Sequence, residues 1–133
     1  MEQLHDRAQR AGHPTAFISG ASKRAERAAA LAAMKTGTLR CLCATYQLAK
    51  EGLDIPRADR LFLASPVRDS VIVQQSVGRI MRPAEGKTDA LVYDFVDRAV
   101  PTCKGQYNAR RRVYKQLHCT VKLEIKTEKE KEQ

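Results

Sequence analysis

Two arginines and a glutamine fall at helical spacing in residues 75–82, which read QSVGRIMR. Side chains three or four positions apart share one face of a helix, so Gln75, Arg79 and Arg82 are predicted to project together. Two guanidinium groups on one face, with Gly78 leaving room for another surface to approach, suit the binding of a triphosphate. The alternative is a solvated basic helix face, which is the commoner role of an arginine pair.

A second candidate site lies in residues 45–56, which read TYQLAKEGLDIP. One helical turn is expected at 46–50, before Gly52 interrupts the segment. The carboxylate of Asp54 can accept hydrogen bonds from ribose hydroxyls, and the hydroxyl of Thr45 can donate to a phosphate. Ligands of parallel sheets bind beyond the carboxyl ends of the strands, where these residues are expected to lie. The alternative for Asp54 is a loop cap, a common role of aspartate in turns.

The elements that must position these side chains alternate between strand and helix. Short apolar runs predict strands at 15–19, 38–45, 60–65 and 88–96, and helices are expected at 2–11, 23–36, 69–82 and about 103–117. Alternation of this kind implies right-handed crossovers and a mostly parallel sheet. Continuous apolar runs such as LFLA and ALVY indicate that helices cover both faces of the sheet. The sequence therefore predicts an α/β domain.

Local signals predict where several of these elements begin and end. Ser22 is the predicted N-cap of the second helix, and Gly37 its C-terminal stop. Asp69 is predicted to cap the third helix, which Pro83 prevents from continuing. Val121–Ile125 alternates apolar and charged residues, like an exposed edge strand.

In series, these segments resemble a known family. A strand ending in CAT at 43–45, then EGLDIP at 51–56 and QQSVGRIMRP at 74–83, resemble motifs V and VI of superfamily 2 helicases. The segments YQLAKEGLDIP and ALVYDFVD are most similar to the corresponding segments of helicases related to type III restriction subunits and of phage DNA helicases. The resemblance covers residues 1–98. It implies a RecA-like domain of three αβα layers within an ATP-driven nucleic-acid motor.

The resemblance also implies roles at a nucleotide site. Arg82 matches the arginine finger that reaches the γ-phosphate of ATP, and Arg79 the neighbouring arginine that faces the same nucleotide. Gln75, the first residue of motif VI, is expected close to the nucleotide cleft, together with Gly78 on the same helix. A further pair, Gly52 and Asp54, matches the glycine and aspartate of motif V, the aspartate near the ribose.

Two further residues match positions that contact nucleic acid. Thr45 matches the motif V threonine that touches the nucleic-acid backbone. Arg27 matches an arginine that grips phosphates, although Arg24 stands where a glutamine is usual three residues earlier. The implied partners are nucleic acid, DNA rather than RNA, and an N-terminal RecA-like helicase domain.

A phosphate loop and an acidic magnesium motif are not visible in the sequence. The segment 86–88 imitates the end of a phosphate loop, but Met81 replaces the required first glycine, and the segment precedes a strand instead of following one. Asp94 lacks a following glutamate and is better interpreted as a strand-end residue of the scaffold. We therefore expect ATP to bind with Mg²⁺ held by the N-terminal domain, and this chain to be inactive alone.

The first strand of the family's domain, with its motif IV, is not recognisable either. Met1 opens in the helix that normally follows that strand. The expectation at this point is a fragment of a longer motor, with an unpaired position in its sheet.

The charge balance points to a polyanionic partner. Lysine and arginine number 24 against 15 aspartates and glutamates, a net charge of +9, with a cluster at Arg110–Arg112. A basic surface with no particular partner explains the charge equally well. The alternative function is thus a non-catalytic nucleic-acid-binding or regulatory module that uses this basic helix and hydrolyses no ATP.

Length and composition indicate one domain. We assign residues 1–126 to it and expect 127–133 (TEKEKEQ) to be a disordered, charged tail. The spacing of the four cysteines fits reduced, packed thiols and not a metal site. No apolar run is long enough for a membrane helix, and the charged N-terminus has no signal-peptide core, so the prediction is a cytoplasmic protein with no membrane partner.

Overall fold

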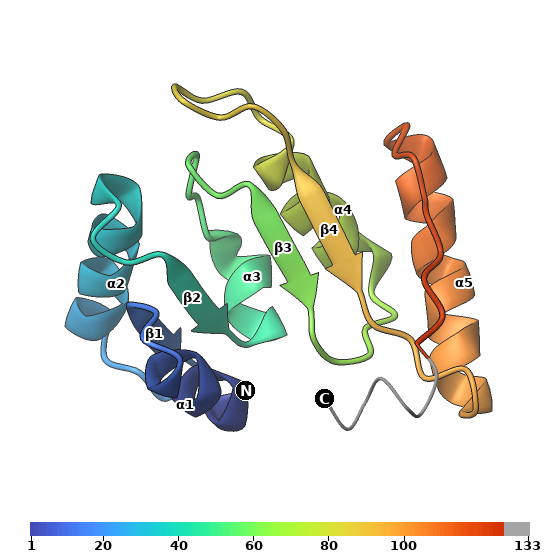
Figure 1. Cartoon of the computed structure of the whole chain (residues 1–133), viewed down its shortest axis with the longest axis horizontal. Coiled ribbons are helices and arrows are strands. Elements are labelled where there is room, and N and C mark those ends of the chain that lie inside the picture. The colour runs from blue at the N-terminus through green and yellow to red at the C-terminus, as the bar shows by residue number, and fades with distance from the viewer. Residues whose placement is uncertain (127–133) are drawn as a thin grey trace.

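The computed structural model describes residues 1–126, and the predicted tail at 127–133 lies outside the described residues. The described elements follow in the order α1 (Glu2–Arg10), β1 (Thr15–Ile18), α2 (Arg24–Thr36), β2 (Cys41–Ala44), α3 (Tyr46–Gly52), β3 (Arg60–Leu63), α4 (Ser70–Ile80), β4 (Leu91–Asp94) and α5 (Pro101–Gln116). Strands and helices alternate as predicted, and the fold class is α/β (Figure 1).

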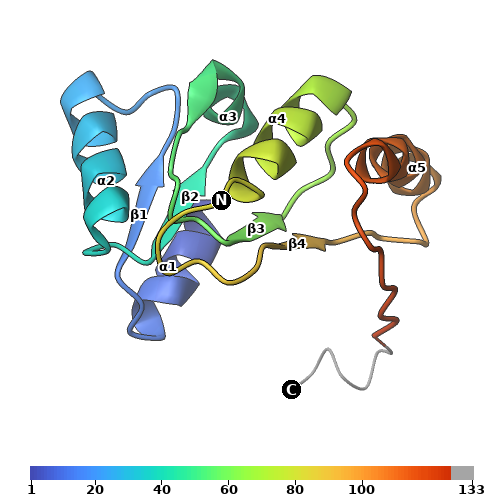
Figure 2. The ribbon, with the colours of Figure 1, turned by 90° about the horizontal axis from the view of Figure 1, so that it is seen from above.

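The strands form two parallel pairs, not one continuous ladder. β1 pairs with β2, and β3 pairs with β4, both in parallel register. Figure 2 shows α2, α3, α4 and α5 on one side of the strands and α1 on the other, beneath β1 and β2, which gives three layers there. The other face of β3 and β4 is exposed at Phe62, Leu91 and Tyr93, so the prediction from LFLA and ALVY that helices cover both faces is wrong for these two strands. β2 and β3 are neighbours in both views but belong to separate sheets. No strand pairing joins β2 to β3 among the described residues.

Helix ends follow the predicted signals in two cases and depart from them in one. The Asp69 carboxylate accepts hydrogen bonds from the backbone N–H groups of Val71 and Ile72, which confirms the cap of α4. Gly37 ends α2 in the left-handed conformation, with φ of 81°. The N-cap of α2 is Lys23, not Ser22 as predicted. The Ser22 hydroxyl instead accepts from the backbone of Ser19, which stabilises the turn before the helix.

The core consists of two clusters joined by α3. The larger one lies between α4, α5 and the β3–β4 pair, and the smaller one between α2, α3 and the β1–β2 pair. The larger cluster contains Leu63, Val67, Ile72, Val73, Val77, Val113 and Tyr114. The smaller contains Ile18, Ala30 and Leu48. Tyr46 and Ala49 of α3 pack against the larger cluster, while Leu48 of the same helix belongs to the smaller one.

A buried ion pair fixes α5 to the end of β4. The Arg110 guanidinium donates to both carboxylate oxygens of Asp94, at 2.8 and 2.7 Å, and to the carbonyl of Val67. The Tyr114 hydroxyl also donates to Asp94. Burial raises the pKa of Tyr114, and the hydrogen bond to Asp94 adds to the rise. Burial alone would lower the pKa of Arg110, but the bonds to Asp94 outweigh it and leave that pKa raised.

This ion pair settles two sequence-based interpretations. Asp94 is a scaffold residue, as predicted. Arg110 is only 2% exposed, so it is not available to a partner. The interpretation of Arg110–Arg112 as one basic cluster is therefore wrong for Arg110. The prediction of an edge strand at 121–125 is wrong, because residues 121–126 are exposed and pair with no strand among the described residues.

Candidate functional site

The predicted site residues separate into two groups at opposite edges of the strands. α3 starts after Thr45 at the carboxyl end of β2 and runs for seven residues to Gly52, about 10 Å at 1.5 Å per residue. The loop that follows, which holds Asp54, leads to the start of β3 (Figure 1). Gly52 and Asp54 therefore lie toward the amino ends of the strands, and the prediction that they share the carboxyl edge with Thr45 is wrong. A full helix stands where a single turn was expected.

Arg79 of α4 lies against the end of α3. Its guanidinium donates to the carbonyl of Ala49 at 3.2 Å. A Cβ at Gly52 would stand 3.4 Å from the Arg79 guanidinium, and the φ of Gly52 is +105°. Both the backbone conformation and the close approach favour glycine at this position. The two motifs that were predicted to act together are thus in contact.

Arg82, just after α4, and Asp54, in the loop after α3, form an ion pair. The Arg82 guanidinium lies 3.6 Å from the Asp54 carboxylate, and the two side chains are 63% and 59% exposed. An ion pair this exposed contributes little to stability, on the order of 0–1 kcal/mol. Both groups are therefore accessible to a ligand at low energetic cost.

A groove of about 580 Å³ runs along α4 beside this pair. It is lined by Val71, Gln74, Gln75, Gly78, Arg79 and Arg82. Four of the predicted nucleotide-site residues therefore line one concave surface, with Gly52 and Asp54 next to it. Sequence reasoning missed Gln74 and also Lys87, whose ammonium donates to the carbonyl of Arg82 at 2.9 Å. Lys87 had been considered only as a phosphate-loop lysine.

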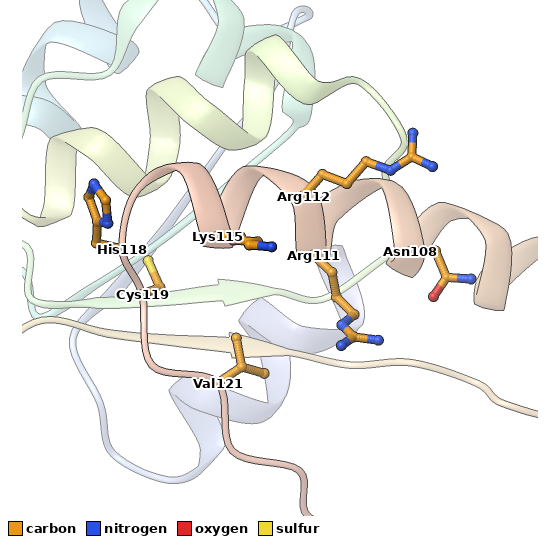
Figure 3. Close-up of a pocket in the computed structure, with 7 residues that line it drawn as sticks. All are labelled: Asn108, Arg111, Arg112, Lys115, His118, Cys119 and Val121. Atoms are coloured by element: carbon orange, nitrogen blue, oxygen red, sulfur yellow. The ribbon is translucent and has the colours of Figure 1, made fainter.

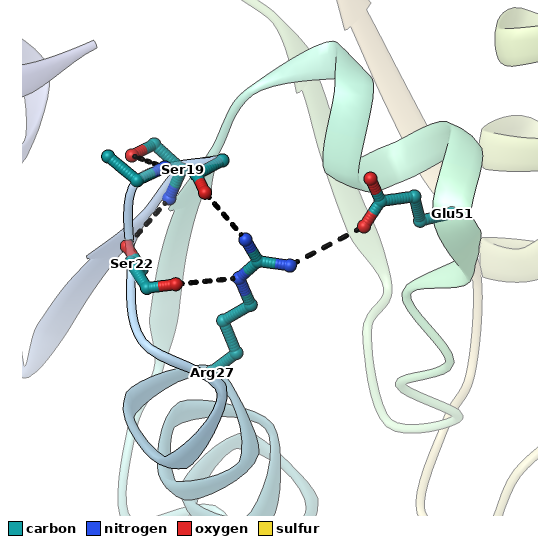
Figure 4. A network of polar contacts seen from close by, with 6 residues as sticks. Ser19, Ser22, Arg27 and Glu51 are labelled. Atoms are coloured by element: carbon teal, nitrogen blue, oxygen red, sulfur yellow. Dashed lines mark hydrogen bonds and ion pairs between the residues drawn. The ribbon is translucent and has the colours of Figure 1, made fainter.

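Thr45 and Arg27 lie at the carboxyl edge. The Thr45 hydroxyl is buried and has no hydrogen-bond partner within the described residues. Figure 4 shows the Arg27 guanidinium held between the turn after β1 and Glu51 of α3. It donates to the carbonyls of Gly20 and Ser22, at 2.8 and 3.2 Å, and lies 3.5 Å from the Glu51 carboxylate. These bonds leave the Arg27 side chain 30% exposed.

Residues 1–126 contain no group of three or more histidine, cysteine, aspartate or glutamate side chains arranged to hold a metal ion. The four cysteines are free thiols. Burial, together with the neighbouring Cys41, raises the pKa of Cys43 to about 11. No helix in this part of the chain combines the length and apolar character needed to cross a bilayer.

The family described as the helicase conserved C-terminal domain matches residues 1–84. The chain belongs to this family. One curated relative is the ATP-dependent DNA helicase uvsW of Enterobacteria phage T4, which is 33% identical over 58 residues, or 44% of this chain. Another is putative helicase 22 of Sulfolobus islandicus filamentous virus (isolate Iceland/Hveragerdi), which is 31% identical over 80 residues, or 60% of this chain. The matched segments span 12% and 14% of those relatives.

Solved structures of helicase C-terminal domains share the fold. The C-terminal domain of the DEAD-box protein Dbp5 superposes with a TM-score of 0.65 at 20% identity, covering 87% of this chain and 63% of that one. A Dbp5 variant from S. cerevisiae bound to Gle1 and IP6 gives a TM-score of 0.67 at 20% identity over 96% of this chain and 32% of that one. At these identities the likeness shows the RecA-like helicase C-terminal fold alone.

Proposed function

We propose that this helicase C-terminal domain is one half of an ATP-dependent nucleic-acid motor and completes an ATP site with an N-terminal RecA-like domain. The observation that carries the proposal is the meeting of Gly52 and Asp54 with Arg79 and Arg82 beside one groove. Asp54 and Arg82 form an ion pair, and Arg79 donates to the backbone of α3. A generic basic helix face would not require that arrangement.

The residues of the groove fit part of ATP and not all of it. Two guanidiniums suit the charge of the terminal phosphates, and the Asp54 carboxylate suits a ribose hydroxyl. Arg82 would exchange its exposed ion pair with Asp54 for a phosphate, which needs little energy because that pair is solvated. No described carboxylate cluster fits Mg²⁺, so the metal would be held by the N-terminal domain.

Thr45 and Arg27 support a nucleic-acid track at the opposite edge. The buried Thr45 hydroxyl without a partner would donate to a backbone phosphate after a small movement of the turn. Thr45 and Arg27 are separated from the nucleotide groove, and this suits a motor. When the two RecA-like domains close over ATP at one edge, α3 would transmit the movement to the nucleic-acid residues at the other edge. One relative is described as a DNA helicase, which favours DNA over RNA.

The test is an ATPase assay on a motor that joins an N-terminal RecA-like helicase domain to this chain. Arg82→Ala should lower turnover by roughly 10³-fold or more, the contribution of arginine fingers in other phosphoryl-transfer systems. Arg98→Ala, an exposed arginine after β4, is the matched control and should leave turnover unchanged. Turnover of the Arg82→Ala motor equal to that of the control would refute the proposal.

A further inference from the structure

α5 and the described residues that follow it carry an excess of positive charge. Residues 101–123 contain no aspartate or glutamate. The exposed cationic side chains are Lys104, Arg111, Arg112, Lys115 and Lys122, with His118 beside them. The ion pair of Arg110 with Asp94 is the one salt bridge in which any described residue of α5 takes part. The outer charges of α5 are therefore free to bind a partner.

Arg111, Arg112, Lys115 and His118 line a groove at the end of the molecule. The groove has a volume of about 680 Å³ and is lined by Asn108, Arg111, Arg112, Lys115, His118, Cys119 and Val121. His118, with φ of +57°, reverses the chain after α5, so that 119–121 form the second wall. Figure 3 shows Arg111 and Arg112 extending to different flanks of the helix, with Lys115 between them and His118.

The spacing of the cations matches a repeating anion. Lys104, Arg111 and Lys115 lie at helical intervals on one face, with the uncharged Asn108 between the first two, and the 11 steps from Lys104 to Lys115 extend over about 16 Å. A single phosphate or carboxylate would occupy only a part of such a row. A polymer with regularly spaced phosphates would contact several of its charges at once.

The groove has no exposed tyrosine, phenylalanine or tryptophan on which a base could stack, and its one exposed ring is the imidazole of His118. Tyr107 is half-buried, with the guanidiniums of Arg110 and Arg111 at 5.8 and 6.0 Å from its ring centre, and Tyr114 is buried. Proteins that bind single strands usually combine positive charge with stacking side chains. A surface with four cationic or titratable side chains and a single small ring suits a polymer whose bases are turned inward.

We propose that the α5 groove binds the phosphodiester backbone of a nucleic-acid duplex without reading its sequence. The surface is distinct from Thr45 and Arg27, because α5 and α2 lie at opposite ends of the molecule (Figure 1). It would hold the duplex beside the motor while the carboxyl edge engages a strand. The proposal requires neither ATP nor a second domain, so it stands or falls separately from the proposed function.

The test measures binding of this chain to labelled nucleic acid by fluorescence anisotropy at several salt concentrations. Probes are blunt DNA and RNA duplexes, the corresponding single strands, and polyglutamate. The variant Arg111→Gln/Arg112→Gln/Lys115→Gln should bind duplexes at least about tenfold more weakly, and the slope of log K against log salt should fall by about 2–3, since each phosphate contact contributes roughly 0.9. Arg7→Gln/Arg10→Gln/Lys35→Gln removes the same charge from exposed positions of α1 and α2 and should change both quantities much less.

Several outcomes would overturn the proposal. Equal losses in the two triple variants would mean that net charge, not the α5 groove, attracts nucleic acid. Tighter binding of single strands than of duplexes, or equal binding of polyglutamate, would also reject it. Circular dichroism melts of both triple variants establish that they are folded. The charge-retaining variant Arg111→Lys/Arg112→Lys should bind duplexes nearly as tightly as the unchanged chain, which separates loss of charge from a local disturbance of α5. A difference between DNA and RNA duplexes would identify which one the groove prefers.

Discussion

The arginine side chains of this chain differ in how many partners the fold gives to each guanidinium. Arg110 makes three hydrogen bonds, two to Asp94 and one to Val67, and is 2% exposed. Arg79 donates to one carbonyl, and Arg82 has only an exposed ion pair at 3.6 Å. The first is a structural residue, while the other two have guanidinium N–H groups without a partner among the described residues. The arginines of this chain thus differ in how far the fold satisfies them.

The buried pair predicts a large stability effect at Asp94. Asp94→Asn leaves the Arg110 charge buried without its counter-ion, and breaking such pairs typically costs about 3–5 kcal/mol. Asp97→Asn, at an exposed position three residues later whose side chain accepts a backbone bond, should change stability by less than about 0.5 kcal/mol. Urea unfolding followed by circular dichroism measures both. Similar midpoints for the two variants would contradict the structural role of the pair.

Alkaline pH should destabilise the domain through Cys43 and Tyr114. The pKa of Cys43 rises from 9.0 to about 11 on folding, and that of Tyr114 also rises. A raised pKa means that the folded state keeps a proton that the unfolded state loses, so the contribution is complete below pH 9 and disappears as the pH rises toward 11. The free energy of unfolding should therefore fall between pH 9 and 11. Cys43→Ala should make the decline shallower, and an unchanged slope would show that the thiol does not titrate this way.

At the scale of elements, the sequence was a good guide to caps and a poor guide to lengths. Asp69 and Gly37 were found because N-caps and left-handed helix ends depend on one residue each. The edge predicted for Gly52 and Asp54 was wrong because α3 continues to Gly52 and leads the chain away from the carboxyl end of β2. Similarly, the local sequence does not distinguish Arg110 from its neighbours. Only the rotation of α5 against β4 decides which arginine meets Asp94.

Two glycines in or next to helices should respond oppositely to alanine. Gly37 has φ of +81°, and a Cβ there would lie 2.5 Å from the Arg57 guanidinium, so Gly37→Ala should destabilise by about 1 kcal/mol or more. Gly105 lies within α5 with no atom near its Cβ position. Gly105→Ala should therefore stabilise the domain by roughly 0.5–1 kcal/mol. Thermal melts of the two variants should shift in opposite directions; shifts of one sign would refute this account of α2 and α5.

At the scale of the whole molecule, the separated strand pairs imply unequal local stability. The β3–β4 side has seven buried residues in its cluster, and the β1–β2 side has three. Each fully buried apolar side chain contributes about 1.5–3 kcal/mol. No sheet hydrogen bond joins the two halves, and α3 is the element that belongs to both clusters. The smaller half should therefore open without the larger one.

Native-state hydrogen exchange measures this order of opening. Amides of β1 and β2 should exchange at least roughly tenfold faster than those of β3 and α4, because partial opening exposes them before global unfolding does. In the partly open state, β1 and β2 are exposed while the larger cluster stays packed. Val77→Ala, at a fully buried position of that cluster, therefore destabilises the native state and the partly open state equally relative to the unfolded chain. It should lower the protection of α4 by on the order of tenfold and leave β1 and β2 unchanged. Equal loss of protection in all four elements would mean that the domain unfolds as a single cooperative unit, and the gap between β2 and β3 would then have no energetic consequence.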